Sequence, residues 1–440
     1  MRALHFSAYN GHVVRHCCEA WFFIFERIVA LLRNRTLLAV SFAVCATYTG
    51  IGMVAPVRVL YAESHGASLF IIGAMASSYL ISNFLFQYPS GWLADRWGRK
   101  PMMILSLFLQ AIISATYLLI ADPILFVLVR FIEGAVAAAF LPSSRAIITD
   151  AIPAEKRGEA FGIYSAFFNA GFLLGPALGG IIASTGYASA FIGAVIFRLV
   201  AIVIVVTMIR VPGKSRQSRL EKAPRVPLST LFAPPLLAAY MLEFVNFLFV
   251  GFDISLTPLW MHDHLGASVA MIGIAYMAWS VSGIVAAPFG GRLADRKRRS
   301  TMILIFGLIQ VPFYVYYGMA NTAIIVVVVF GVHGLAYSLM QPAIDAHLAG
   351  ASKPDARARI QGMYSAFGMF GGFVGATASS LLYAVNYRLP LFSIAVIFGI
   401  GILVGGTVIR VSEARGLTTW GNTKPETRTD KPEIIVTAIE

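Results

Sequence analysis

The stretch Gly91-Trp-Leu-Ala-Asp-Arg-Trp-Gly-Arg-Lys100 recurs 200 residues later as Gly291-Arg-Leu-Ala-Asp-Arg-Lys-Arg-Arg299. The coinciding positions include glycine, aspartate and arginine, which shared apolar composition would not place in register. A repeat at one fixed spacing indicates a duplicated structural unit. The same shift also aligns Gly66/Gly266, Gln110/Gln310, Gly134/Gly334, Pro142/Pro342 and the Tyr-Ser-Ala-Phe runs at 164–167 and 364–367. The chain is therefore predicted to contain two copies of one unit.

Both copies are strongly apolar. Of the 440 residues, 58% are hydrophobic and only 12% are charged. Soluble domains carry about 25% charged residues, so this chain has too little charge to cover a water-facing surface. The composition excludes a soluble enzyme, a disordered chain and a coiled coil. It predicts a polytopic membrane protein, with about 20 apolar residues for each crossing.

Apolar runs bounded by charge, glycine or proline predict twelve membrane-spanning helices. They lie at 36–60, 69–93, 101–121, 124–147, 159–184, 187–210, 233–260, 269–293, 300–319, 322–347, 358–384 and 387–410. The predicted fold is all-α, with two pseudo-symmetric six-helix bundles. The predicted organisation is an N-terminal segment 1–35, a bundle 36–210, a basic linker 211–231, a bundle 232–410 and a tail 411–440. The aromatic run at 21–25 predicts an interfacial helix, with a mistaken start codon or a mitochondrial presequence as alternatives.

The net charge of +13 comes from an uneven distribution of basic residues. If both termini lie on one side, that side holds 30 of the 34 lysines and arginines. Cytoplasmic loops retain such residues, so both termini are predicted to be cytoplasmic, in the plasma membrane. A nucleic-acid partner is not needed to explain the charge. Three cysteines, two of them adjacent at 17 and 18, predict no disulfide framework or metal site.

The stretch at 91–100 resembles the signature loop GxLaDrxGRk of the Major Facilitator Superfamily. The second copy differs at Arg298, where the family has glycine. The resemblance covers roughly 36–410 and implies two bundles that rock around one central site, latched at the cytoplasmic side. A basic loop that only sets topology is the alternative. Arg99 is expected to pair with Asp150 or Glu155. The predicted latch residues are Gly91, Asp95, Arg96, Gly98, Arg99, Gly291, Asp295 and Arg296.

Two further stretches resemble motifs of the same family. Arg130-Phe-Ile-Glu-Gly134 is similar to the RxxxG element, whose arginine is tied to proton coupling, although a satisfied structural pair is the alternative. The run from 171 to 180 resembles the antiporter signature gxxxGPxxGG of drug and tetracycline efflux members, and also suits close helix packing. Its residues are Gly171, Gly175, Pro176, Gly179 and Gly180. Residues 50–56 are more loosely similar to the glycine-rich, proline-ending first helix of the family's twelve-span drug–proton antiporters.

Few ionisable side chains fall inside the predicted spans, and each is a functional candidate because charge is costly there. An antiporter needs a buried group whose protonation competes with substrate binding. Glu133 beside Arg130 is the first candidate, followed by Glu243 and Asp345. His333 is weaker, because a lone histidine is more often structural. Polar stripes and mid-span aromatic residues predict a substrate cavity lined by Asn246, Asp253, Tyr48, Tyr164, Phe168, Phe247, Tyr276, Trp279, His333, Tyr337 and Gln341.

These features predict a secondary transporter, most simply a proton-coupled exporter of small hydrophobic or drug-like compounds. An uptake symporter or facilitator for a polar metabolite, such as a sugar or organic acid, is the alternative, and a transporter-like scaffold or sensor without transport is a third hypothesis. No P-loop, HExxH or GxSxG motif stands in a suitable context, so an enzyme is not expected. The expected partners are a small substrate, protons and the lipid bilayer. No cofactor or metal is expected, and a monomer is the family default.

Overall fold

The structure is a computed structural model, and it describes residues 33–153, 156–209, 231–296, 298–352 and 357–416. The predicted interfacial helix at 21–25, the cysteines at 17 and 18, Glu155 and nearly all of the linker 211–231 lie outside these residues. The side chains of Asp95, Asp295 and Arg296 are also outside the description.

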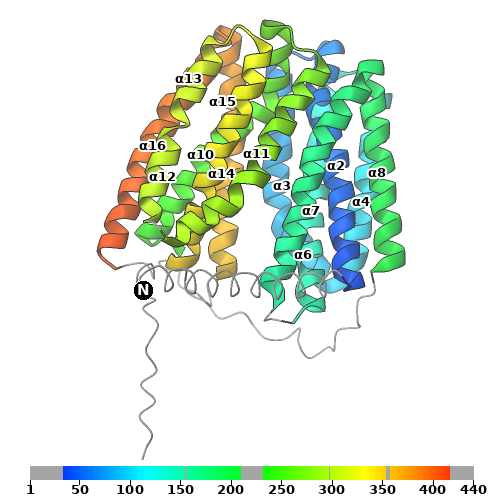
Figure 1. Ribbon diagram of the computed structural model, residues 1–440. Helices are drawn as coiled ribbons and strands as arrows, with labels where there is room; N and C mark the ends of the chain where they lie inside the picture. The colour runs from blue at the N-terminus through cyan, green and yellow to red at the C-terminus, as the bar shows by residue number, and fades with distance from the viewer. Residues whose placement is uncertain (1–32, 154–155, 210–230, 297, 353–356, 417–440) are drawn as a thin grey trace, which may run out of the picture.

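The first half of the chain forms one helical bundle (Figure 1). Its elements are α2 (Arg35–Ser64), α3 (Leu69–Trp97), α4 (Arg99–Thr116), η1 (Tyr117–Leu119), α5 (Pro123–Ala137), α6 (Phe140–Ala151), α7 (Arg157–Ile182), η3 (Ala183–Thr185) and α8 (Tyr187–Met208). Helices α5 and α6 together make one crossing from Pro123 to Ala151.

The second half forms a matching bundle beside the first. Its elements are α10 (Pro234–Leu265), α11 (Val269–Arg296), α12 (Arg299–Leu308), α13 (Val311–Met319), α14 (Ala323–Ala351), α15 (Arg357–Val385) and α16 (Leu389–Ala414). The described residues contain twelve helices that are long and apolar enough to cross a membrane. The predicted number of spans is confirmed, and their limits differ from the predicted ones by a few residues at most ends.

Local sequence signals explain where several helices begin and end. Asn34 caps α2 by accepting a hydrogen bond from the Leu37 amide at 3.0 Å. Asp122 caps α5 in the same way, accepting from the Ile124 amide at 2.8 Å, and is followed by a proline in the first turn. Such caps satisfy amide groups that have no partner within the helix. Gly98 separates α3 from α4 with a φ of +102°, a conformation that a side chain would disfavour.

Equivalent contacts in the two bundles follow the 200-residue repeat. The Arg99 side chain donates to the carbonyl of Ala146 at 2.6 Å, and Arg299 donates to the carbonyl of Ala346 at 2.8 Å. A Cβ on Gly134 would meet the carbonyl oxygen of Tyr79, whereas one on Gly334 would meet that of Trp279. The duplicated sequence therefore builds the same helix contacts twice, as the predicted pseudo-symmetry requires.

The two ends of the molecule differ in how closely the bundles approach. We call the end that carries Arg99 and Arg299, at the bottom of Figure 1, the basic end. At the opposite end, α3 of the first bundle meets α15 of the second, where the hydroxyl groups of Ser77 and Thr377 lie 2.8 Å apart.

Helices α7 and α11 also meet at the opposite end. The backbone of α11 is so near Gly180 that a Cβ there would lie 2.7 Å from the carbonyl oxygen of Val269. At the basic end, by contrast, a Cβ on Gly91, Gly291 or Gly362 would meet nothing within 4 Å. The hydrogen bonds that link the bundles, Ser77 to Thr377 and Ser280 to the Phe172 carbonyl, lie in the halves of α3 and α11 away from the basic end. The structure is therefore a state in which the bundles are sealed at the opposite end and apart at the basic end.

Candidate functional site

An aromatic cavity of about 150 Å³ lies within the second bundle. That volume matches cavities known to hold a benzene-sized ring. Among its walls, the rings of Phe249 and Tyr314 are 5.0 Å apart, and Trp279 lies 5.6 Å from Phe330. The full lining is Asn246, Phe249, Val250, Asp253, Tyr276, Trp279, Tyr314, Phe330 and Tyr337.

Two polar atoms of this cavity wall have no partner. Asn246 Oδ1 and Asp253 Oδ1 are buried and accept no hydrogen bond. Among the described residues, no lysine or arginine forms an ion pair with Asp253. A carboxylate surrounded by aromatic faces suits a ligand that is both cationic and apolar, because the rings attract cations through their π faces.

The sequence predicted five lining residues of this cavity and missed four. Asn246, Asp253, Tyr276, Trp279 and Tyr337 were predicted, whereas the missed residues are Phe249, Val250, Tyr314 and Phe330. Phe249 could have been found, since it lies between Asn246 and Asp253 at helical spacing. Tyr314 and Phe330 come from neighbouring helices, and no periodic signal in the sequence marks them.

A second polar group, which we call the acidic network, lies closer to the basic end. The Tyr364 hydroxyl donates to Glu243 Oε2 at 2.6 Å, and the Gln341 amide donates to the Tyr364 oxygen at 2.8 Å. The same amide reaches Asp345 Oδ1 at 3.3 Å, and Asn246 approaches Gln341 at 3.5 Å. Glu243 is buried, while Asp345 is exposed. This series of hydrogen bonds therefore links the carboxyl group of Glu243 on α10 to that of Asp345 on α14 through neutral side chains.

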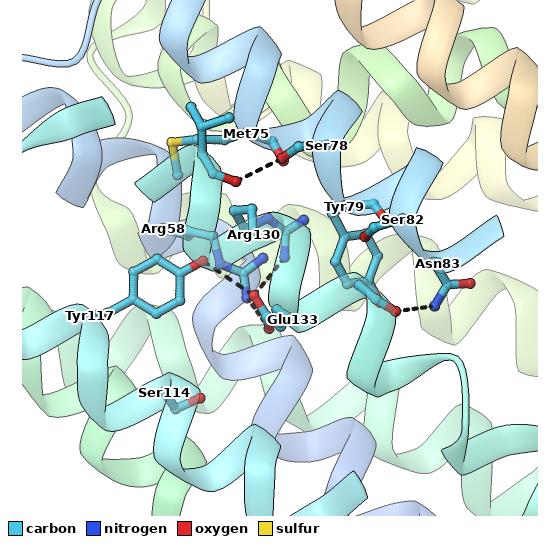
Figure 2. A network of polar contacts seen from close by, with 12 residues as sticks. Arg58, Met75, Ser78, Tyr79, Ser82, Asn83, Ser114, Tyr117, Arg130 and Glu133 are labelled. Atoms are coloured by element: carbon cyan, nitrogen blue, oxygen red, sulfur yellow. Dashed lines mark hydrogen bonds and ion pairs between the residues drawn. The ribbon is translucent and has the colours of Figure 1, made fainter. Parts of the chain in front are cut away.

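The third group, the arginine cluster, lies in the first bundle and surrounds Glu133 (Figure 2). Arg130 pairs with Glu133 Oε2 at 2.9 Å, as its spacing on the helix predicted. Arg58 and Arg198 approach Oε1 at 3.3 Å and 3.9 Å. Tyr117 donates to Oε2 at 3.2 Å. Arg58 and Arg198 were not predicted as partners, because they come from α2 and α8, far away in the sequence.

The other predicted cavity residues lie elsewhere. Tyr48 and Phe168 pack together in the first bundle, with ring centroids 4.3 Å apart. Tyr164 is also in that bundle, with its hydroxyl 2.8 Å from that of Ser144. Phe247 faces Gly368 of α15. These four residues are not among the lining of the aromatic cavity.

His333 is held inside the second bundle. It is fully buried, with Nδ1 3.1 Å from the Tyr317 hydroxyl and Nε2 3.3 Å from Gln310 Oε1. Both ring nitrogens thus have partners, which fits the structural alternative considered for this residue. Its ring still stacks edge-on against Trp279 at 4.9 Å, just behind the cavity wall.

The run 171–180 performs two different packing tasks. Gly171, Gly175 and Gly179 face α2 of their own bundle, where a Cβ on Gly179 would lie 2.0 Å from the Met53 carbonyl oxygen. Gly180 instead faces α11 of the other bundle, and the carbonyl group of Pro176 lies against Gly273 of that helix, while the Pro176 ring packs on Gly52 of α2. The motif therefore tightens the first bundle on one side and seals the opposite end on the other side.

Among the predicted latch residues whose side chains are described, Arg99 and Arg96 make contacts within the first bundle. Arg99 pairs with Asp150, as predicted, but α4 and α6 that carry them belong to one bundle. The exposed Arg96 lies over the ring of Trp92, its neighbour on α3. Among the described residues, no three His, Cys, Asp or Glu side chains gather as a metal ion would require.

Two six-helix bundles around a shared central region, with buried charge in each, define a membrane transporter of the two-fold repeat type. The chain matches the sequence profile described as Major Facilitator Superfamily over residues 40–256 and 240–433. The chain belongs to this family.

Individual relatives share about a quarter of their residues with this chain. The chain is 24% identical over 385 residues to the quinolone resistance protein NorA of Staphylococcus aureus (strain COL), covering 86% of this chain and 97% of that protein. It is 24% identical over 379 residues to multidrug resistance protein 1 of Bacillus subtilis (strain 168), covering 84% and 95%.

Solved structures share the fold at low sequence identity. A D-xylose–proton symporter has a TM-score of 0.69 at 16% identity, with 85% of this chain and 96% of that chain covered. A bacterial homologue of the human lysosomal transporter Spinster, in an inward-facing and occupied conformation, has a TM-score of 0.68 at 16% identity, with 87% and 97% covered.

Proposed function

We propose that the protein exports small hydrophobic, drug-like compounds, with a preference for cations, in exchange for protons. The observation that carries this proposal is the aromatic cavity with the unpaired Asp253 oxygen in its wall. The glycine–proline motif of 171–180 and the names of the two bacterial relatives support export of such compounds.

The orientation of the protein in the membrane is inferred from its charge. Basic loops are retained in the cytoplasm, so the basic end faces the cytoplasm of a plasma-membrane protein. The described state is then open inward and closed outward. An exporter loads its substrate in this state, releases it after the bundles rock, and returns with protons bound.

The acidic network suits the proton-carrying step better than Glu133 does. Glu243 and Asp345 are joined by neutral groups alone, so a proton or a substrate cation can balance their charge in turn. Glu133 is already paired with three guanidinium groups. Protonating it would leave those groups uncompensated in a buried place, which is costly.

The test is a proton-coupling assay in proteoliposomes that contain a pH-sensitive dye, with an imposed pH gradient. Lipophilic cations, tetracyclines and sugars are added in turn to wild type, Glu243→Gln, Asp345→Asn and Glu133→Gln. We expect a lipophilic cation to dissipate the gradient in wild type and in correctly folded Glu133→Gln, but not in Glu243→Gln or Asp345→Asn.

Other outcomes separate the alternatives. If Glu133→Gln alone uncouples, the proton is carried in the arginine cluster. If only a sugar or organic acid moves, and moves equally without a gradient, the protein is a facilitator and the export proposal fails. The second candidate is retained because the acidic network presents several hydrogen-bonding groups that a polar metabolite could use.

A further inference from the structure

The arginine cluster carries more positive charge than its carboxylate balances. Glu133 is paired with three guanidinium groups, on Arg58, Arg130 and Arg198, which leaves a net charge of +2. Among the described residues, no second carboxylate pairs with these arginines. Arg130 and Arg198 are 3% and 0% exposed. Buried charge without a counter-charge is strongly unfavourable.

The hydrogen-bond donors of the cluster that lack an acceptor belong to Arg58 and Arg198. Arg130 and Tyr117 both take Glu133 Oε2 at normal hydrogen-bond distances. Arg58 and Arg198 share Oε1 at longer distances. Arg58 Nε, Arg198 Nε and Arg198 Nη2 are buried and have no hydrogen-bond partner. A water molecule could accept from these groups, but it would not offset their charge.

The repeat shows that the fold itself does not require this charge. At the positions 200 residues on, Arg58, Arg130 and Arg198 are replaced by Pro258, Phe330 and Phe398. Two of these replacements are aromatic, and the equivalent region of the second bundle is the wall of the aromatic cavity and its surroundings. The same helix arrangement is thus built with arginines in one bundle and with apolar residues in the other, so the fold does not explain why the first bundle has three buried arginines.

The same comparison indicates a reduced side-chain volume beside Arg198. In the second bundle, the rings of Tyr314 and Phe398 pack together with centroids 5.1 Å apart. In the first bundle the equivalent of Tyr314 is Ser114, whose hydroxyl accepts a hydrogen bond from Arg198. A phenol ring is therefore replaced by a small hydroxyl next to the unpartnered guanidinium.

We propose that Arg58 and Arg198 bind a small monovalent anion, of the chloride type, inside the first bundle. The anion accepts from Arg58 Nε and from Arg198 Nε and Nη2, and it lowers the net charge of the cluster to +1. It must be small, because Arg198 is fully buried and a drug-sized carboxylate would have to enter the bundle to reach it. This site is separate from the aromatic cavity and does not depend on which compound is transported.

The experiment measures thermal unfolding of the purified full-length protein in detergent while chloride replaces gluconate at constant ionic strength. A ligand that binds only the folded protein raises the melting temperature in a saturable way. We expect this rise with chloride, bromide and nitrate in wild type. Losing one charge-assisted hydrogen bond should weaken the apparent chloride affinity about tenfold or more in Arg58→Met and Arg198→Met. The matched control, Arg388→Met, removes an exposed arginine outside the cluster and should keep the wild-type response.

Two further measurements keep the proposal falsifiable if a variant does not fold. Anomalous diffraction from wild-type crystals grown in bromide should place a peak between Arg58 and Arg198. In Glu133→Gln, chloride should bind more tightly than in wild type, since the cluster has lost its own carboxylate. The proposal is overturned if the melting temperature ignores chloride at constant ionic strength, if Arg58→Met and Arg198→Met respond as wild type does, or if bromide is absent from the cluster. None of these readouts involves transport, so they stand or fall independently of the proposed function.

Discussion

Replacing Gly273 by alanine should shift the protein out of the state described above. Gly273 lies on α11 where that helix meets α7 of the other bundle. A Cβ there would lie 2.3 Å from the carbonyl oxygen of Pro176. Ordinary contacts begin at about 3.4 Å, so the helices would have to separate by roughly 1 Å. The obstacle is backbone, which no rotamer change can move aside.

The clash is removed with the least disturbance if the two bundles separate at the opposite end. Overpacking of this size costs about 1–3 kcal/mol. That cost applies only to the state sealed at the opposite end, so the ratio of the two states changes by roughly 5- to 150-fold. The basic end should close correspondingly more often.

The assay is maleimide labelling of Gly362→Cys in a background without native cysteines. Position 362 is on α15 near the basic end, with open space around it. If wild type populates both states equally, labelling in Gly273→Ala should slow roughly threefold or more. The control is Gly283→Ala on the same helix, where the nearest atom to a Cβ is 3.4 Å away. Unchanged or faster labelling in Gly273→Ala would refute the assignment of this contact as the seal.

Three further outcomes can be measured. The cysteine pair Ser77→Cys/Thr377→Cys replaces hydroxyls 2.8 Å apart, so oxidation should stop transport and a reductant should restore it; transport by the oxidised, cross-linked protein would contradict alternating access. Trp279→Ala removes a ring from the cavity wall and should raise KM for a lipophilic cation roughly 2- to 12-fold, from about 0.5–1.5 kcal/mol of aromatic contact; an unchanged KM in inverted vesicles would place the substrate elsewhere. Glu133→Gln in chloride-free medium should lose about 3–5 kcal/mol of stability, because three buried guanidinium groups lose their counter-charge; a wild-type melting temperature would show that the cluster is hydrated.

Much of the architecture could be predicted because the bilayer imposes simple rules. Each crossing needs a long apolar helix whose backbone is satisfied internally, so the twelve spans are visible in composition and spacing alone. The repeat then specified two equivalent bundles. Glu133 and Arg130 could be paired in advance, since they are three residues apart on one helix.

The positions of side chains from different helices could not be predicted in this way. Nothing in the local sequence places Arg58 and Arg198 beside Glu133, and aromatic content alone could not separate Tyr48 from Tyr276. The two tyrosines occupy different bundles, and only one lines the cavity.

The spans, the duplication, the family and the residue types available for function can all be recognised in the amino-acid sequence alone. These properties follow from hydrophobic length and from repeated motifs, which are local along the chain. The packing of the helices, by contrast, determines which charges meet, which rings enclose a cavity and which end of the molecule is sealed. Those outcomes depend on the rotation and approach of helices far apart in the sequence, as with Pro176 against Gly273. The two bundles carry the same helix frame, yet packing turned one interior into an arginine cluster and the other into an aromatic cavity.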